Sequence, residues 1–234
     1  MNRLLVISGG SKGIGRAMIE RFAKGGFDCL TCARNDQNLR ELKRHVERTY
    51  SVGFDFVVAD VSKKEDVDSF VGYALASGRK IDVLINNAGY FVPGKITEEA
   101  EGVFEKMIAS NLTSAYRLTR GLVQNMVAAR QGHIFNMCSV ASLFAYPNGG
   151  SYSITKFGLL GFSKVLREEL KQHGIRVTAV MPGATKTASW NGVDLPDDRF
   201  MSPEDVAEAV WGAYSLSTRS VVEELIIRPQ LGDI

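Results

Sequence analysis

Residues 4–24 read LLVISGGSKGIGRAMIERFAK, and this stretch decides the fold of the chain. It begins with an apolar run at 4–7, continues through four glycines and ends in a segment, 14–24, whose apolar residues recur at three- and four-residue spacing. That order predicts a buried strand, a tight turn and an amphipathic helix. Glycines let the turn approach a pyrophosphate closely, and the helix N-terminus offers it free N–H groups. The alternative is a glycine-rich turn that binds no ligand.

The same alternation of apolar run and helical pattern continues along the chain. We expect strands at 4–7, 28–33, 54–59, 83–85, 133–137, 176–180 and 224–227. Helical spacing marks 14–24, 39–49, 63–76, 112–129 and 152–173. Most strand candidates are apolar throughout, as strands buried on both faces should be. No repeat or linker divides the chain, so residues 1–234 are predicted to form one α/β domain. We expect a doubly wound Rossmann fold with a parallel seven-stranded sheet and helices on both faces.

The composition excludes several classes of protein. Hydrophobic residues make up 45% and charged residues 23%, which is typical of a globular protein rather than a disordered chain. The net charge is only +2 and the basic residues are scattered, so no nucleic-acid partner is expected. The N-terminal apolar run is too short for a signal peptide, and no stretch approaches the roughly 18 apolar residues of a membrane span. We therefore expect a cytoplasmic protein with no membrane partner.

The cysteines and histidines do not form a metal motif. Cys29 and Cys32 make a C-x-x-C pattern, but they lie within an expected strand, where they should point to opposite faces. No second cysteine pair completes a zinc site, and the three histidines stand on separate elements. Three cysteines, an odd number, fit a reducing compartment. No metal site is predicted.

Two further motifs follow expected strands. The segment at 86–89 reads NNAG, whose small residues would let a dinucleotide lie across the sheet edge and whose amides would bridge neighbouring strand ends. Tyr152 and Lys156 are four residues apart on an expected helix, so they share a face. An ammonium beside a phenol lowers the phenol's pKa towards the range useful for acid–base catalysis. The alternative is a pair of ordinary surface residues.

These motifs together resemble the short-chain dehydrogenase/reductase family. The glycine turn, NNAG, Tyr-x-x-x-Lys and the Pro-Gly pair at 182–183 occur in the family's order, and the resemblance covers essentially the whole chain. Ser8 stands where the family more often has threonine, a change that keeps the hydroxyl. The resemblance implies an oxidoreductase that binds a nicotinamide dinucleotide. It implies cofactor contacts at Gly9, Ser11, Lys12, Gly13, Ile14, Gly15, Arg34, Asp60, Val61, Asn87, Ala88, Gly89, Tyr152, Lys156, Pro182, Gly183 and Thr187.

The end of the second expected strand distinguishes NAD from NADP. It carries Arg34 and no acid, and a guanidinium there would form charge-assisted bonds to a 2′-phosphate, with Lys12 approaching from the other side. Asp36 competes, because an NAD-binding acid lies about 20 residues past the glycine motif. We interpret Asp36 as a cap or first-turn residue of the next helix and predict NADP(H). By resemblance Asp60 holds the adenine amino group; its alternative role is a helix cap.

The resemblance also implies a catalytic tetrad, and with it a carbonyl reductase. Ser139 lies 13 residues before Tyr152, the family's spacing for a serine that hydrogen-bonds the substrate carbonyl. Asn111 matches the family's asparagine that supports a water linking Lys156 to solvent, although an asparagine there is also a typical helix cap. Hydride transfer from the nicotinamide, with Tyr152 as the proton donor, would then reduce a carbonyl group to an alcohol.

The substrate is indicated only by the last third of the chain. Residues 188–201 would be a short substrate lid, which favours an open pocket, and Trp190 would either stack on a flat ring or only pack the lid. The acids Asp194, Asp197 and Asp198 are candidates for binding ring N–H groups. Segments 182–190, 201–205, 221–229 and 232–234 resemble the bacterial sepiapterin-reductase-like branch, which implies a pteridine such as sepiapterin.

Several alternatives stay open. Among enzymes they are a general ketone or diketone reductase and a 3-oxoacyl reductase. From a different class, a non-catalytic NADP-binding sensor would bind NADPH and consume none. The family commonly forms dimers and tetramers through its two long helices, here 112–129 and 152–173. The resemblance therefore implies a homodimer or homotetramer that acts on a small-molecule carbonyl substrate.

Overall fold

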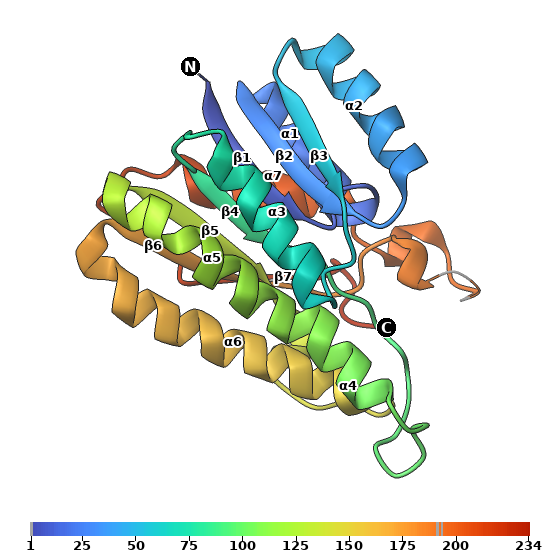
Figure 1. The fold of residues 1–234 in the computed structure, drawn as a ribbon. Helices are drawn as coiled ribbons and strands as arrows, with labels where there is room; N and C mark the ends of the chain where they lie inside the picture. Colours follow the sequence, from blue (N-terminus) through green and yellow to red (C-terminus); the bar gives the residue numbers. More distant parts are fainter. Residues whose placement is uncertain (1, 191, 193) are drawn as a thin grey trace.

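One sheet of seven parallel strands forms the centre of the computed structural model, which describes residues 2–190, 192 and 194–234 (Figure 1). The strand order is β3-β2-β1-β4-β5-β6-β7, and every neighbouring pair is parallel. The strands are β1 (Arg3–Ser8), β2 (Phe27–Ala33), β3 (Phe54–Val58), β4 (Val83–Asn86), β5 (Gly132–Met137), β6 (Ile175–Pro182) and β7 (Glu224–Ile227). The winding reverses between β1 and β4, where such folds bind ligands. The predicted Rossmann fold is confirmed.

Helices cover both faces of this sheet (Figure 1). One face carries α1 (Gly13–Lys24), α2 (Asp36–Tyr50) and α7 (Pro203–Ser215). The other carries α3 (Lys64–Ala76), α5 (Ser114–Ala129) and α6 (Gly150–Leu170). The short α4 (Val103–Ile108) leads through one π-helical turn, Ala109–Thr113, into α5. Across the described part of the chain, no helix combines the length and the apolar content that crossing a bilayer requires.

Alternate residues of each central strand enter different core layers. Leu5 packs into the layer under α1 and α7, whereas Leu4 packs into the layer under α3 and α5. Because successive strand side chains point to opposite faces, a strand covered on both faces must be apolar throughout. Cys29 and Cys32 fall into these two opposite layers, as predicted from their place in a strand, and both thiols are free.

Two helices were not among the sequence predictions, namely α4 and α7. The start of α7 nevertheless carries a readable signal, because Ser202 and Asp205 form a capping box with Pro203 at the first helical position. The Ser202 hydroxyl accepts from the Asp205 N–H at 3.0 Å, and the Asp205 carboxylate accepts from the Ser202 N–H at 3.3 Å. The helix predicted at 152–173 begins two residues earlier, at Gly150, and ends in a 3-10 turn after Leu170.

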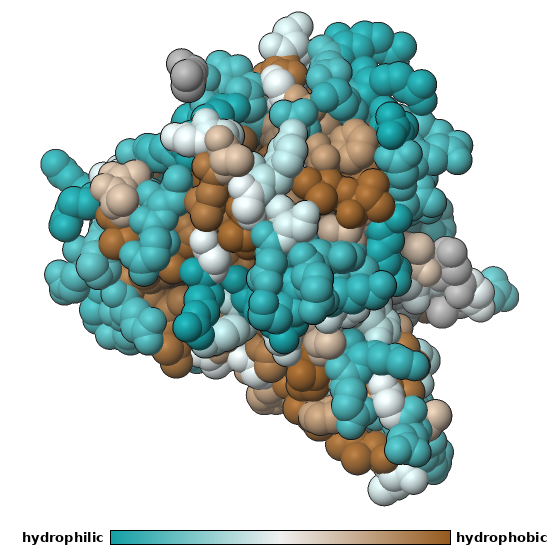
Figure 2. All heavy atoms as spheres, viewed as in Figure 1, coloured by the Kyte–Doolittle hydropathy of each residue, from teal (hydrophilic) through white to brown (hydrophobic). Residues whose placement is uncertain are grey.

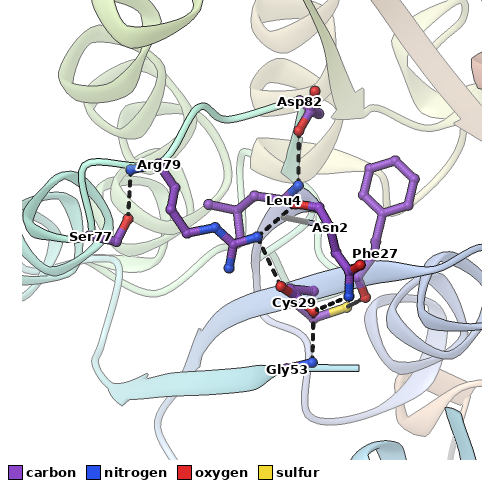
Figure 3. Close-up of polar contacts among 9 residues, drawn as sticks. Asn2, Leu4, Phe27, Cys29, Gly53, Ser77, Arg79 and Asp82 are labelled. Carbon is purple, nitrogen blue, oxygen red and sulfur yellow. Dashed lines mark hydrogen bonds and ion pairs between the residues drawn. The ribbon is translucent and has the colours of Figure 1, made fainter. Parts of the chain in front are cut away.

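A polar cluster joins the amino ends of the strands, on the edge away from their carboxyl ends (Figure 3). The Asp28 carboxylate accepts hydrogen bonds from the Asn2 amide at 3.0 Å and the Gly53 N–H at 2.7 Å. The Arg79 guanidinium lies 2.9 Å from the other carboxylate oxygen and also donates to the Asn2 carbonyl at 2.8 Å. Four chain segments that are far apart in sequence are therefore tied at one aspartate.

Candidate active site

The predicted site residues surround one cleft of about 870 Å³ at the carboxyl ends of the strands, beside the reversal between β1 and β4. The predicted residues that line it are Gly9, Ser11, Lys12, Gly13, Ile14, Gly15, Arg34, Asp60, Val61, Asn87, Ala88, Gly89, Ser139, Tyr152, Lys156, Pro182, Gly183, Thr187 and Trp190. Asn111 lies behind the cleft wall and is buried. Residues distant in sequence thus meet because parallel strands end at the same edge.

The glycine turn and the NNAG segment pack against each other and are joined by hydrogen bonds at this edge. Gly9 adopts φ +72°, and a Cβ on it would lie 3.0 Å from Ala88 Cα. A Cβ on Gly15 would lie only 2.3 Å from the Gly9 carbonyl oxygen, so no side chain fits there. The Asn87 amide donates to the Ser8 and Gly9 carbonyls at 3.0 Å each. The Ser8 hydroxyl accepts from the N–H groups of Asn87 and Ala88 at 3.1 Å each, so serine does perform the hydroxyl's bonding here.

The N-terminus of α1 opens onto the cleft with free donors. The residue before the helix, Lys12, makes no side-chain cap, and among the described residues of the first turn there is no acid. The first N–H groups of a helix have no intrahelical acceptor, and the helix dipole adds partial positive charge there. This arrangement fits a pyrophosphate lying against the glycine turn.

The end of β2 presents cations rather than an acid to the cleft. Arg34 is exposed on the cleft wall and forms no ion pair or hydrogen bond with the side chains that the structure describes. Asp36 does not line the cleft; it stands in the first turn of α2 and binds Arg40 at 2.6 Å. Asn35 caps α2 by accepting from the Asn38 N–H at 2.8 Å. The interpretation of Asp36 as a helix residue is therefore confirmed.

Asp60 organises its own turn and faces the same end of the cleft. Its carboxylate accepts from the N–H of Ser62 at 3.0 Å and from the Ser62 hydroxyl at 2.8 Å, whereas the residue before α3 is Lys63. Burial raises the pKa of Asp60, but the hydrogen bonds from Ser62 and the charges of Arg34 and Lys63 outweigh it, so the pKa is lowered. Asp60 is an ionised acceptor on the cleft wall, and the alternative helix-cap role is not seen.

Tyr152 and Ser139 meet at the inner end of the cleft. Tyr152 lies in the first turn of α6, and Ser139 follows β5 by two residues. Burial raises the pKa of the Tyr152 phenol to about 12, while a side-chain hydrogen bond with Ser139 acts in the opposite direction. The phenol is therefore protonated near neutral pH, which is the state of a proton donor.

Lys156 does not lower the pKa of Tyr152 in this structure, so that prediction from spacing is wrong here. Its Nζ donates to the Met137 carbonyl at 2.6 Å and lies 5.5 Å from the centre of the Tyr152 ring. Burial also lowers the pKa of Lys156 to about 8, since desolvation disfavours the ammonium as it disfavours the phenolate. The helical spacing places both groups on one face, but burial decides their pKa values.

Asn111 occupies the π-helical turn between α4 and α5, not a helix start. Its side-chain oxygen accepts from the Tyr90 N–H at 3.0 Å, and its amide donates to the Tyr90 carbonyl at 2.9 Å. A Cβ on Gly89 would lie 3.1 Å from the Asn111 oxygen and 3.7 Å from Lys156 Nζ. Asn111 and Lys156 therefore both approach Gly89, and a side chain at this position would crowd them.

Two aromatic side chains that the sequence analysis did not identify, Phe91 and Tyr146, also line the cleft. Phe91 packs edge-on against Tyr152 with ring centres 4.9 Å apart. Burial raises the pKa of Tyr146 to about 12, with the nearby Tyr152 adding to the effect. Trp190 lines the cleft and also packs against Phe200, with the ring centres 5.2 Å apart. Phe91 and Tyr146 lie in loops, where no periodicity marks them.

A second acid, Asp233, lines the cleft in addition to Asp60. Asp233 and Ile234 line the cleft, and the Asp233 carboxylate lies 3.2 Å from the position of a Cβ on Gly183. Arg228 pairs with Asp233 at 3.5 Å. Asp194, Asp197 and Asp198, the acids suggested by the sequence, do not line the cleft. Residues 191 and 193 of segment 188–201 lie outside the described residues. Within the described parts of the chain, no three His, Cys, Asp or Glu side chains are grouped to hold a metal ion.

Comparison with known proteins gives consistent results. A family model described as short chain dehydrogenase matches residues 3–196. The sepiapterin reductase of Chlorobaculum tepidum is 34% identical across 100% of this chain and 99% of that protein. An alcohol dehydrogenase from Thermococcus sibiricus, complexed with 5-hydroxy-NADP, superposes with a TM-score of 0.91 at 27% identity over 97% of each chain. The L-sorbose reductase of Gluconobacter frateurii, complexed with NADPH and L-sorbose, has a TM-score of 0.88 at 31% identity over 97% and 95% of the two chains.

Proposed function

The chain belongs to the short chain dehydrogenase family, and from this premise we propose that it is an NADPH-dependent carbonyl reductase in which Tyr152 donates the proton. The observation that carries the proposal is the protonated Tyr152 phenol, which lines a dinucleotide-sized cleft together with Ser139 and Lys156. A protein that only binds the cofactor has no need for a phenol and a serine hydroxyl in the same part of its cleft. The protein is thus an oxidoreductase, and the identity of its carbonyl substrate has to be argued separately.

The cofactor is NADP(H). The capless N-terminus of α1 would hold the pyrophosphate, and Arg34 would bind the 2′-phosphate without first breaking an ion pair to any side chain that the structure describes. Asp60 would accept from the adenine amino group. Structural relatives crystallised with NADP or NADPH support this choice. When bound, the nicotinamide supplies the hydride.

The chain's own residues handle the carbonyl oxygen. The Ser139 hydroxyl would donate to that oxygen and orient it, and the Tyr152 phenol would transfer its proton to it as negative charge develops. Lys156, held by the Met137 carbonyl, would bind the nicotinamide ribose and return a proton to Tyr152. Asn111, across Gly89 from Lys156, would support the path of that proton to solvent.

The wall of the cleft supports a flat, nitrogen-rich substrate. Phe91, Tyr146 and Trp190 offer aromatic faces, and the Asp233 carboxylate offers an acceptor for paired ring N–H groups. A pteridine that carries a side-chain carbonyl, such as sepiapterin, combines these features, and segment 188–201 would be its lid. The relative from Chlorobaculum tepidum is named for that substrate. The main alternative within the family is a general reductase of ketones and diketones.

We also propose that the protein forms a homodimer or homotetramer through α5 and α6. Tyr116 and Phe157 on these helices are 47% and 46% exposed, and Val165 is 55% exposed. Apolar atoms also gather on the projection formed by residues 90–102 and α4 (Figure 2). Burial of such side chains between copies would remove apolar area from water. Sedimentation equilibrium measures the state directly, and a monomer at all concentrations would contradict this proposal.

The first experiment follows the loss of nicotinamide absorbance when the protein is mixed with NADPH and sepiapterin or a simple diketone. Tyr152→Phe removes only the proton donor and should lower kcat about 10²–10⁴-fold. Tyr73→Phe, an exposed phenol on α3, is the matched control and should turn over as the wild type does. Near-wild-type turnover in Tyr152→Phe would overturn the catalytic assignment. Activity on diketones alone would discard the pteridine, and NADPH binding without consumption would favour the sensor.

A further inference from the structure

We propose that Glu99 is a positioning residue for Tyr152, because its carboxylate caps the helix that carries the catalytic phenol from a separate loop. The inference rests on the proposed function of Tyr152. Glu99 lies in the loop at 90–102, which projects from the body of the molecule below α4 (Figure 1). Nothing in the spacing of the catalytic motifs indicates this residue, since it lies 52 residues before its partner.

The carboxylate of Glu99 closes the start of α6 with two hydrogen bonds. One oxygen accepts from the Ser151 N–H at 2.9 Å, and the other accepts from the Ser151 hydroxyl. Gly149, which precedes α6, has no side chain to cap the helix. A free N–H at a helix start needs an acceptor, and negative charge there is favoured by the helix dipole. Glu99, from a distant part of the sequence, therefore supplies the hydrogen-bond acceptor that the residues next to the start of α6 do not provide.

The same loop holds Tyr152 at two further points. The Gly94 N–H donates to the Asn148 carbonyl at 3.0 Å, which fixes the loop to the turn before α6. Phe91, near the start of the loop, packs edge-on against the Tyr152 ring at 4.9 Å. The loop at 90–102 thus contacts both the backbone that precedes Tyr152 and the ring of Tyr152 itself.

These contacts affect the position of the catalytic phenol because Tyr152 directly follows Ser151. A fraying or rotation of the first turn of α6 would move the phenol relative to Ser139, which lies on a different element. Proton transfer depends steeply on such geometry, and a displacement of about 1 Å costs up to about 100-fold in rate. Lys156 lies a full turn further along the helix and binds Met137, so it is held independently. Loss of the cap should therefore lower kcat and leave NADPH binding intact.

The test compares Glu99→Ala, Glu99→Gln and Glu98→Gln. Glu98 is the neighbouring carboxylate of the loop, is well exposed and pairs only with Lys95 among the described side chains, so it is the matched control. Loss of a helix cap changes an equilibrium about 2- to 30-fold. We expect Glu99→Ala to lower kcat about tenfold with little change in the Kd for NADPH. Glu99→Gln keeps an oxygen acceptor and should restore most of that loss, and Glu98→Gln should match the wild type.

Hydrogen exchange of the segment 150–156 provides a readout that does not depend on turnover. Glu99→Ala should speed exchange there and leave the rest of α6 unchanged. Unchanged exchange, an undiminished kcat in Glu99→Ala, or an equal loss in Glu98→Gln would each overturn the positioning role. If the wild type reduces no carbonyl compound, the proposed function fails, and the exchange result alone then decides whether Glu99 caps α6.

Discussion

Tyr152 keeps its proton near neutral pH because burial penalises the phenolate more than the hydrogen bond with Ser139 favours it. A protonated phenol can act as an acid at once, which suits reduction of a carbonyl group better than oxidation of an alcohol. Lys156, with its pKa lowered to about 8, holds a proton below that pH and, in the proposed mechanism, would return it to the phenol. The two side chains would then divide the donation and the resupply of the proton between them.

We propose that the choice between NADPH and NADH depends on Arg34. Arg34→Ala should raise the Kd for NADPH about 10–100-fold, because a charge-assisted contact to the 2′-phosphate contributes about 1.5–3 kcal/mol. The Kd for NADH, which lacks this phosphate, should change little. Fluorescence titration with both cofactors measures this difference. Arg40→Ala, on the exposed side of α2, is the control. An equal weakening of both cofactors in Arg34→Ala would contradict the phosphate contact.

The turn between β1 and α1 works as a unit with the NNAG segment. Gly9 needs its positive φ, Gly15 needs the absence of a side chain, and Asn87 ties the two carbonyls at the end of β1. This close packing lets the first turn of α1 present its N–H groups to an anion. In the proposed function this turn would bind the pyrophosphate through backbone N–H groups, and its glycines matter by having no side chain.

A methyl group at Gly15 should disrupt this turn. Gly15→Ala would place a Cβ 2.3 Å from the Gly9 carbonyl oxygen, so the turn must shift. We expect a loss of about 1–3 kcal/mol in unfolding free energy and at least tenfold weaker NADPH binding. Gly72→Ala on α3 meets no atom within 4 Å and should stabilise the protein by up to about 1 kcal/mol. Urea unfolding and cofactor titration measure both effects, and a neutral Gly15→Ala would disprove the close approach.

The molecule separates its binding edge from a stabilising edge. The cleft lies at the carboxyl ends of the strands, whereas the cluster around Asp28 ties β1, β2, the approach to β3 and the approach to β4 at the opposite edge. Figure 3 labels Asn2, Gly53 and Arg79 of this cluster. Burial raises the pKa of Asp28, but the hydrogen bonds from Asn2, Gly53 and Arg79, with the charge of Arg79, lower it below the ordinary value of 3.8. A carboxylate with a lowered pKa stabilises the folded state only while it is ionised.

Asp28 should therefore contribute stability that depends on pH. Its contribution is fully present above pH 3.8 and is lost as the pH falls through the lower pKa of the folded state. Asp28→Asn should lower the unfolding free energy at pH 7 by about 1–3 kcal/mol, and the difference from the wild type should shrink below that window. Asp55→Asn, an exposed carboxylate on β3, should change stability by less than about 1 kcal/mol. Denaturant curves at pH 7 and pH 3 test this, and a constant difference at both pH values would contradict it.

Local patterns in the sequence predicted the sheet and the glycine turn, whereas the family resemblance supplied most of the predicted cleft residues. The strands of a doubly covered sheet are apolar throughout, and a glycine turn after the first of them marks the binding edge, so both follow from short-range chemistry. The spacing of Tyr152 and Lys156 places them on one helix face for the same reason. These features depend on neighbours in sequence, and the sequence alone determined them.

Tertiary structure alone decided the pKa values in the site and the contacts that Glu99 and Asp233 make with distant parts of the chain. The pKa of Tyr152 depends on how much protein covers it, and burial is a property of packing that spacing does not express. Glu99 reaches Ser151, and Asp233 reaches Gly183, only because separate elements end at the same edge of the sheet. Periodicity reports which face a residue occupies, whereas contacts between distant loops arise only when the chain has closed into its fold.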